Sequence, residues 1–189
     1  MEARPLRVLS EDEYLTIEES NGALSDYVNG EAFECAGASE AHNLVVTNLA
    51  GRLSALLAER PCVVLSSQQR IATVATRAFH HPDLTVVCGA IERHPKDRNT
   101  ITNPTLVVEV LSPSTADYDR GAKFDHYRSM ASLGEVLFVA PEARTIEQRR
   151  RLPSGEWVVR WFSEGSIELA AIGATLEVHV AFTKLELLG

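Results

Sequence analysis

Cysteine is scarce in this sequence. Only three cysteines occur in 189 residues, at Cys35, Cys62 and Cys88, and no two of them have the C-x-x-C spacing of a zinc or redox motif. An odd number of cysteines without that spacing predicts neither a disulfide framework nor a structural zinc site. We therefore expect the chain to fold in a reducing compartment.

Long apolar runs are absent as well. No apolar stretch reaches the roughly 18 residues that a membrane-spanning helix needs. The first five residues, M-E-A-R-P, lack the apolar segment of a secretory signal. The sequence thus favours a soluble, cytoplasmic protein with no membrane partner.

An excess of basic residues is the third feature that the sequence lacks. Lys and Arg number 18 against 26 Asp and Glu, which gives a formal net charge of −8 at pH 7. A large basic footprint of the kind that grips duplex DNA is therefore not predicted for the molecule as a whole. A local basic strip, or metal ions held by acidic side chains, would still allow a nucleic-acid substrate.

The length and composition are those of an ordinary globular protein. Hydrophobic residues make up 45% of the chain and charged residues 23%. A chain of this length buries about 70% of the surface that its unfolded state exposes. We expect a single domain over residues 1–189, without repeats, low-complexity tracts or linkers.

Acidic side chains accompany two predicted strands. Residues 106–111 form an apolar, β-branched run that predicts a buried strand, and Glu109 lies inside it. Burying an unpaired carboxylate is costly, so we expect a metal ion or a counter-charge beside Glu109. Asp83 directly precedes a second β-branched run, at residues 84–88, although an acid after Pro82 is also typical of a turn.

A lysine follows on the next predicted helix. Residues 112–115 end the strand and begin a helix over about residues 115–131, which carries Lys123. Two strand-borne acids and this lysine form a candidate site for a metal ion and an activated water. The competing interpretation of Lys123 is an exposed ion pair with Asp119, four residues earlier.

The remaining sequence predicts a mixture of helices and strands. Ser10 and Glu13 fit the capping box of a short helix, and Asn29-Gly30 predicts the turn of a hairpin. The longest helix is expected over residues 40–59, and residues 89–103 are expected to form a surface loop or a short helix. Further strands are predicted at residues 62–65, 69–74, 136–139, 145–152 and 157–162. One or two short strands are expected after residue 167, and a final helical turn is expected at residues 184–188. This order predicts an α/β (α+β) fold with a mixed central β-sheet flanked by helices.

Several segments together resemble one bacterial family. They are D-Y-V-N-G-E at residues 26–31, His42, P-D-L-T-V-V-C at residues 82–88, and V-V-E-V-L-S-P-S-T at residues 107–115 followed by D-R-G-A-K at residues 119–123. These segments resemble the Uma-type family, whose members are commonly regarded as restriction endonucleases of the PD-(D/E)XK superfamily. The resemblance covers about residues 10–150 and implies a restriction-endonuclease-like core with an added N-terminal helix and β-hairpin.

The resemblance also implies roles for individual residues. Asp83 and Glu109 match the family's metal-binding acids, and the backbone carbonyl of Val110 is a further candidate ligand for Mg²⁺ or Mn²⁺. The superfamily's lysine ordinarily stands two residues after the second acid, where this chain has Leu111. Lys123 matches a lysine moved to the following helix.

Four further residues are candidate accessories to the site. Asp26 stands where the family usually has Glu, and Glu31 lies across the predicted turn from it. His42 opens the long helix, and Gln69 matches a polar position in the strand before the P-D motif. The competing interpretations are that both acids only flank the turn and that His42 caps or packs its helix.

Histidine and aromatic residues near these segments have structural interpretations. His80 and His81 are neighbours in sequence, so in a strand their side chains would point to opposite faces, which argues against a shared zinc ion. Phe124 and Tyr127 are expected in the core.

The last third of the chain carries a basic run and two tryptophans. The arginines at residues 149–151 are expected on an edge strand that their charge keeps exposed, although phosphate contact is the alternative. Trp157, Trp161 and Phe162 on the next strand are candidates for a homodimer interface.

Two classes of function follow from these features. The first is a metal-dependent endonuclease that hydrolyses phosphodiester bonds, with DNA favoured over RNA or a small nucleotide. The second is a non-catalytic, nuclease-like binding or scaffold protein, which the acidic net charge, the displaced lysine and Asp26 in place of Glu favour.

Overall fold

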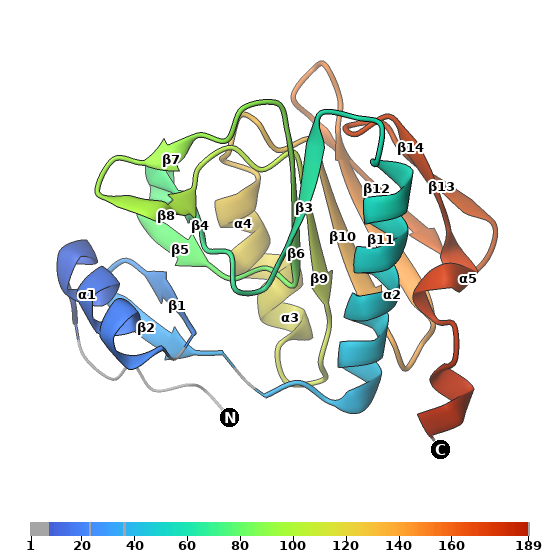
Figure 1. Ribbon diagram of the computed structural model, residues 1–189, viewed down its shortest axis with the longest axis horizontal. Coiled ribbons are helices and arrows are strands. Elements are labelled where there is room, and N and C mark those ends of the chain that lie inside the picture. The colour runs from blue at the N-terminus through green and yellow to red at the C-terminus, as the bar shows by residue number, and fades with distance from the viewer. Residues whose placement is uncertain (1–7, 23, 36, 189) are drawn as a thin grey trace.

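The strands of the protein form two six-stranded sheets and one two-stranded sheet in the computed structural model, which describes residues 8–22, 24–35 and 37–188 (Figure 1). The central sheet has the strand order β12-β11-β10-β9-β6-β3. Its strands β9 and β10 run parallel, and every other neighbouring pair in it is antiparallel. The bounds are Trp157–Phe162 (β12), Thr145–Arg151 (β11), Glu135–Ala140 (β10), Leu106–Val110 (β9), Leu84–Cys88 (β6) and Cys62–Ser66 (β3).

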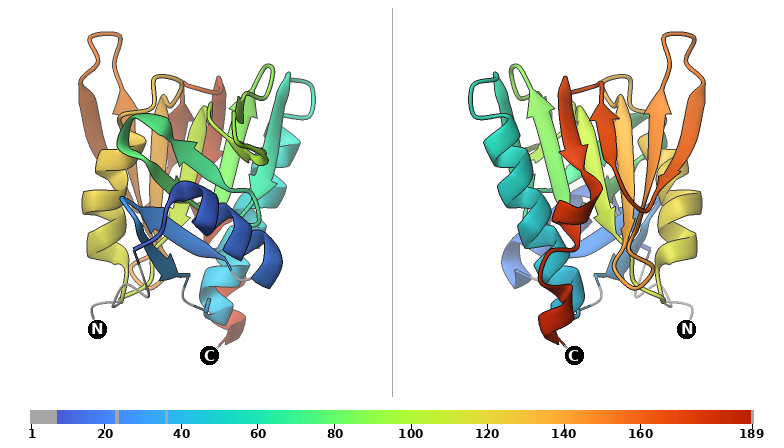
Figure 2. Two further views of the ribbon diagram at one scale, coloured as in Figure 1. Left: turned by 90° about the vertical axis from the view of Figure 1, so that its left-hand side faces the viewer. Right: turned by 90° about the vertical axis from the view of Figure 1, so that its right-hand side faces the viewer.

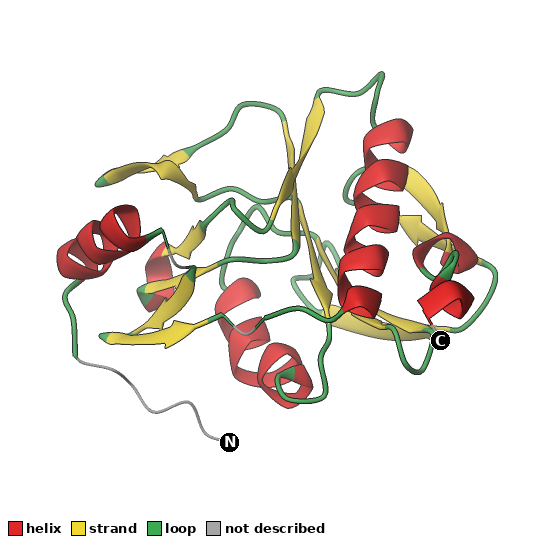
Figure 3. Cartoon of the chain, turned by 60° about the horizontal axis from the view of Figure 1, so that its bottom comes forward, coloured by secondary structure: helices red, strands yellow, loops and turns green. Residues whose placement is uncertain are grey.

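Helices cover both faces of the central sheet (Figure 3). Helix α2 (Glu40–Leu56) packs on the face that carries Leu106 and Val108. The other face, which carries Val107, is covered by a helical segment made of α3 (Ala116–Tyr118), the π-helix η2 (Asp119–Lys123) and α4 (Phe124–Tyr127). Because side chains alternate along a strand, Glu109 shares the face of Val107 and points toward this helical segment.

The second six-stranded sheet, in the order β2-β1-β5-β4-β8-β7, lies beside the central sheet together with helix α1 (Glu11–Asn21) (Figure 2). Tyr14 of α1 stacks on Tyr27 with ring centroids 4.8 Å apart and lies 5.4 Å from Phe79. These rings form a small core of their own. The bounds are Ser25–Val28 (β1), Glu31–Glu34 (β2), Ile71–Thr73 (β4), Ala78–His80 (β5), Arg93–His94 (β7) and Asp97–Ile101 (β8).

The C-terminal part of the described chain completes the face covered by α2. Strands β13 (Ser166–Leu169) and β14 (Ala174–Glu177) form the two-stranded sheet. Helix α5 (Val178–Ala181) follows, and its buried residues belong to the same hydrophobic core as those of α2. The 3₁₀ turns are η1 (Val74–Thr76) and η3 (Leu185–Leu188), the second at the predicted helical turn. Among the residues described, no helix has the length and apolarity to cross a membrane.

Local sequence signals located several elements correctly. Ser10 Oγ accepts the N–H of Glu13, and the Glu13 carboxylate accepts the N–H of Ser10, which is the predicted capping box. Asn29 and Gly30 have φ values of 50° and 99° in the turn between β1 and β2, a conformation that the Asn-Gly pair readily adopts. The mixed α/β fold is confirmed, with strands on the predicted segments and α2 as the longest helix.

Three element predictions were wrong. The segment at residues 89–103 is not only a loop or a short helix, because β7 and β8 pair within it as a hairpin. The strand predicted at residues 69–74 is confined to Ile71–Thr73, which leaves Gln69 in the bend before it. The helix predicted over residues 115–131 ends as α4 at Tyr127 and contains a π-helix instead of being uniformly α-helical.

The arginines at residues 149–151 do not lie on an edge strand, because β11 is paired on both sides. All three are half-buried. The guanidinium of Arg149 lies 4.3 Å from the ring centroid of Phe124 and 4.8 Å from that of Phe138. Burial of flat cationic groups over aromatic rings explains why this basic run is not a solvated edge.

Cys62 and Cys88 form a disulfide, so the expectation of no disulfide was wrong. The two cysteines are directly opposite each other where β3 pairs with β6. Their separation of 26 residues in sequence hid this contact, since only the pairing of the strands brings the two side chains together. Cys35 is the free cysteine.

Candidate active site

Asp83 lies at the entrance of β6, against the exit of β9. Because these strands are antiparallel neighbours, with Leu84 opposite Val108, the residue before β6 reaches the residue that ends β9. The Val110 N–H donates to Asp83 Oδ2 at 2.7 Å. Asp83 therefore stands at the entry to β6, where a turn residue would stand, and it also lies next to the strand that carries Glu109.

Glu109 is buried inside β9 and has two polar neighbours on the facing helical segment. Lys123 Nζ lies 2.8 Å from Glu109 Oε1, and the Tyr127 hydroxyl donates to the same oxygen at 2.5 Å. Burial raises the pKa of Glu109 to about 8; Lys123 acts against this rise, whereas the nearby carboxylates of Asp119 and Asp83 add to it. The expected counter-charge beside Glu109 is thus Lys123.

Lys123 is buried among three carboxylates. Besides Glu109, its Nζ lies 3.4 Å from Asp119 Oδ1 and 3.7 Å from Asp26 Oδ2. Burial would lower the pKa of Lys123, but the attraction of these acids outweighs burial and holds that pKa well above its usual value. Lys123 therefore keeps its charge, and the ion pair with Asp119 exists together with the contact to Glu109.

A π-helix positions this lysine. Lys123 is the last residue of η2, and Tyr127 follows four residues later in α4. The π-helical turn widens the helix by one residue, a feature that recurs at functional sites. Both side chains reach Glu109 from the same helical face.

Asp26 joins the site from the second sheet. Its Oδ2 lies 3.0 Å from His80 Nδ1, and its Oδ1 accepts the backbone N–H of His81 at 3.0 Å. Burial alone would raise the pKa of Asp26, but the charge of Lys123 and the contacts with His80 hold it well below the usual range. The Asp26 side chain thus contacts Lys123 and does not only flank the turn between β1 and β2.

His42 reaches Asp83 from the first turn of α2. Ser39 caps this helix by accepting the His42 N–H at 3.2 Å, which directs the imidazole toward the sheet. Its Nε2 lies 3.2 Å from Asp83 Oδ2. The hydrogen bond to Asp83 raises the pKa of His42 against the effect of burial, and the Val110 carbonyl adds to the rise. The His42 imidazole therefore lies beside two of the predicted metal ligands, Asp83 and Val110.

Two of the predicted accessories make other contacts. Gln69 Nε2 donates to the carbonyls of Arg70 and Asn99, which ties the bend before β4 to β8. Glu31 lies on β2 opposite Val28. Among the described residues, no hydrogen bond or ion pair joins the Glu31 or Gln69 side chain to Asp83, Glu109 or Lys123.

The sequence interpretation did not predict three residues of the site, which are Tyr127, Asp119 and His80. Tyr127 was expected only in the core, yet its hydroxyl contacts Glu109. The available signal was its spacing of four residues from Lys123, which places both on one helical face. No comparable signal was available for His80, which lies on β5, a strand that was not predicted.

The donor atoms at this site suit a hard divalent cation. Each contact given above for Asp83 uses Oδ2, and each contact of Glu109 uses Oε1, so the second oxygen of each acid makes no hydrogen bond to the described residues. Together with the Val110 carbonyl, these are the oxygen ligands that Mg²⁺ prefers. Three carboxylates lie around Lys123, and a fourth, that of Asp83, lies near Glu109, so a cation would also relieve an excess of negative charge.

The fold matches that of a solved protein. A crystal structure titled as that of "a putative nuclease" from Anabaena variabilis ATCC 29413 matches with a TM-score of 0.75 at 17% sequence identity. The match covers 95% of this chain and 98% of that chain. The match therefore supports the mixed α/β fold of this chain.

The chain belongs to the Uma2 family, described as "Putative restriction endonuclease", whose model matches residues 11–180. Two proteins of Synechocystis sp. (strain ATCC 27184 / PCC 6803 / Kazusa) are similar over nearly their whole lengths. Uncharacterized protein slr1290 is 32% identical over 182 residues, which are 96% of this chain and 95% of the relative. Uncharacterized protein sll1609 is 28% identical over 179 residues, 95% of this chain and 96% of the relative. The family resemblance read from the sequence is confirmed.

Proposed function

We propose that this protein is a metal-dependent endonuclease that hydrolyses phosphodiester bonds, with DNA as its substrate. The observation that carries the proposal is the convergence of Asp83, Glu109 and Lys123 at one end of the central sheet. They come from three separate elements, and membership of a family described as restriction endonucleases is consistent with such a site.

Asp83, Glu109 and the Val110 carbonyl would hold Mg²⁺ or Mn²⁺ in this proposal. When bound, the cation would lower the pKa of a coordinated water and neutralise phosphate charge. The oxygens Asp83 Oδ1 and Glu109 Oε2 are the ligand atoms that the contacts of these acids leave available. His42 would help to orient Asp83 through its contact with Oδ2.

Lys123 would stabilise the negative charge that develops on the phosphate. Its three acidic neighbours keep it protonated and hold its amine at the site before substrate arrives. A fixed positive charge in a buried setting stabilises a transition state more than the same charge in water. Tyr127 would orient Glu109 by donating to Oε1.

Cleavage of plasmid and linear DNA with Mg²⁺ or Mn²⁺ tests this proposal. The variants Asp83→Asn, Glu109→Gln and Lys123→Met should each lower the rate by roughly 100-fold or more. Lys96→Met and Asp12→Asn are matched controls, because they remove an exposed ion pair of the same residue types outside the site. Equal cutting by the wild type and all three site variants would show that a contaminant cuts the DNA.

The second candidate is a non-catalytic, nuclease-like binding or scaffold protein. One observation favours it: protein groups already pair both acids, Lys123 with Glu109 and His42 with Asp83. Calorimetry with manganese separates the candidates, because a catalytic site must bind the ion. A folded wild type that takes up no manganese would favour the scaffold.

A further inference from the structure

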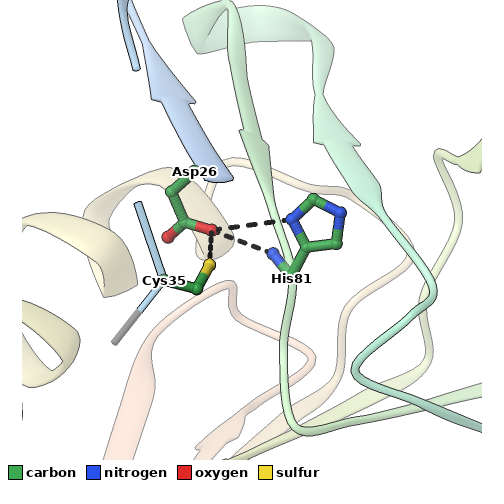
Figure 4. Close-up of side chains that lie close together, drawn as sticks. All are labelled: Asp26, Cys35 and His81. Atoms are coloured by element: carbon green, nitrogen blue, oxygen red, sulfur yellow. Dashed lines mark hydrogen bonds and ion pairs between the residues drawn. The ribbon is translucent and has the colours of Figure 1, made fainter. Parts of the chain in front are cut away.

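Asp26, Cys35 and His81 bring three different ligand types together on one side of Asp26 (Figure 4). Cys35 Sγ lies 3.9 Å from Asp26 Oδ1, and His81 Nδ1 lies 4.0 Å from the same oxygen. One ligand atom from each residue lies within 4.8 Å of the other two. This spacing is close to that of atoms around one small cation, and no role in the proposed nuclease reaction involves Cys35 or His81.

Strand pairing explains why these residues meet. Strand β1, which carries Asp26, lies between β2 and β5 and is antiparallel to both. Residues that follow β2 and β5 therefore arrive together at the start of β1. Cys35 continues β2, with its N–H donating to the Leu24 carbonyl at 3.1 Å, and His81 directly follows β5.

His81 has a ring nitrogen that lacks a hydrogen-bond partner. The side chain is 3% exposed, and the buried Nδ1 makes no hydrogen bond. Its other nitrogen, Nε2, lies 3.5 Å from Glu18 Oε1. Glu18 is in turn paired with Arg70. A carboxylate beside the second ring nitrogen is a common neighbour of a metal-binding histidine.

The unpartnered ring nitrogen of His81 faces Asp26. Its Nδ1 lies 4.0 Å from Asp26 Oδ1, and that oxygen also accepts the His81 backbone N–H at 3.0 Å and the Cys35 S–H at 3.9 Å. A cation bound beside Oδ1 would give the buried Nδ1 the partner that it lacks among the described residues.

Cys35 contributes a soft ligand to the same cluster. Cys35 is exposed, and its S–H group donates to Asp26 Oδ1 at 3.9 Å. With thiolate, carboxylate and neutral imidazole as ligands, the donor set carries two negative charges, which match a doubly charged ion.

We propose that Asp26, Cys35 and His81 form a second metal site, which binds zinc or a similar borderline divalent ion with a water in the fourth position. Sulfur, nitrogen and oxygen donors together are the ligand set of zinc, whereas magnesium takes oxygen ligands. On binding, the Cys35 S–H bond breaks, a sulfur–metal bond forms and the proton leaves to solvent, with no change of oxidation state.

The two sides of Asp26 separate this site from the proposed nuclease site. Oδ1 faces Cys35 and His81, whereas Oδ2 faces His80 and Lys123. The second site does not depend on the nuclease proposal. A variant of Asp83 should therefore leave it intact.

Cobalt titration of the metal-free protein tests the site directly. Cobalt bound by a thiolate gives a sulfur-to-metal charge-transfer absorption, and Cys35 is the thiol available because Cys62 and Cys88 are joined. We expect the band to saturate at one equivalent of cobalt and to disappear when zinc displaces it. Cys35→Ser should abolish the band, and His81→Ala should weaken cobalt binding by roughly tenfold or more.

Two controls make the result specific. His94→Ala removes another buried histidine whose Nδ1 lacks a hydrogen bond, and it should keep the band. Asp83→Asn should also keep it, since that change affects only the proposed nuclease site. A wild type without the band at saturating cobalt, or a band that persists in Cys35→Ser, would overturn the second site.

Alkylation of the wild type avoids any folding defect of the variants. One equivalent of zinc should slow the reaction of Cys35 with a maleimide by tenfold or more, as located by peptide mass spectrometry, because a bound thiolate is a poor nucleophile. Magnesium at the same concentration should not slow it. Equal alkylation with and without zinc would contradict the proposal even if every variant failed to fold.

Discussion

Lys123 Nζ lies 2.8 Å from Glu109 Oε1, although the two residues belong to different elements. Glu109 is in a central strand, and Lys123 ends a π-helix on the facing layer. The superfamily motif that the chain resembles has its lysine on the strand itself, two residues after the acid. In this protein the lysine that contacts the acid Glu109 is Lys123, which comes from the helical segment packed on the sheet.

Removal of the lysine charge should destabilise the protein. Lys123→Met leaves Glu109 and Asp26 buried without their cation, and breaking a buried pair in this way costs about 3–5 kcal/mol. The double variant Lys123→Met/Glu109→Gln should recover part of that loss, because it removes one of the uncompensated charges. Urea unfolding of both single variants and the double variant measures the coupling. Strictly additive losses would contradict a direct interaction.

The Tyr127 hydroxyl should contribute both to stability and to activity. Tyr127→Phe removes a hydrogen bond to Glu109, which should cost about 1.5–3 kcal/mol of stability and lower DNA cleavage by roughly tenfold or more. Tyr27→Phe is the matched control, because it removes a buried hydroxyl bonded to the Leu9 carbonyl outside the site. If both variants lost cleavage to the same extent, Tyr127 would have no special role.

Reduction of the disulfide should weaken the fold. Cys62 and Cys88 close a loop with a sequence separation of 26, for which loop-closure entropy predicts a loss of about 3 kcal/mol. Urea unfolding with and without reductant, in a Cys35→Ser background, measures this loss. The double variant Cys62→Ser/Cys88→Ser should match the reduced protein and no longer respond to reductant. An unchanged midpoint after complete reduction would contradict the prediction.

Stability should fall as the pH rises from about 5 to about 7 because of Glu135. Burial raises the pKa of this residue from 4.5 to about 7, although the N–H groups of Ala171 and Ala170 oppose the rise. An acid whose folded-state pKa is raised stabilises the fold fully below its unfolded pKa, and that contribution is lost as the pH rises through the folded pKa. The loss between pH 5 and pH 8 should be about 1–3 kcal/mol.

The variant Glu135→Gln isolates this effect. Its amide cannot ionise, so the pH dependence of unfolding should be flatter by the same amount. The Glu135→Gln variant should also be less stable than the wild type at pH 5. In the wild type both carboxyl oxygens of Glu135 accept backbone N–H groups, and the NH₂ group of Gln would face one of these donors. Identical pH slopes in the two proteins would show that Glu135 does not titrate in this range.

Strand β12 is the proposed homodimer interface, because it is an edge of the central sheet. Trp161 is 59% exposed and Val159 48% exposed on this strand. Trp161→Glu should shift a dimer to monomer in light scattering, whereas Val74→Lys, at a 60% exposed position outside the edge, should not. A wild type that is monomeric at high concentration would contradict the interface.

The candidate site shows where sequence interpretation was sufficient. Glu109 could be singled out because a carboxylate inside an apolar strand needs a partner, whichever partner the fold provides. Asp83 and Lys123 followed from the strand and helix patterns and also matched the family, and Asp26 was singled out through the family resemblance. Lys123 contacts Glu109 and Asp26, and Asp83 accepts the N–H of Val110, the residue after Glu109. Gln69 matched the same pattern more weakly, and its hydrogen bonds tie a bend to β8 instead.

The remaining features depended on contacts between distant segments. The pairing of Cys62 with Cys88 follows from the register of β3 with β6, and the meeting of Asp26, Cys35 and His81 follows from β1 lying between β2 and β5. Neither contact can be predicted from the spacing of these residues along the chain.

The sequence by itself determined the local structure: the capping box at Ser10, the turn at Asn29-Gly30, and a buried strand that carries an acid. These features depend on neighbouring residues, so local propensity and periodicity are enough to predict them. Only the tertiary structure decided which groups neutralise Glu109, which cysteines join and which histidine faces Asp26. Those outcomes depend on strand order and register, which the packing of the whole chain fixes.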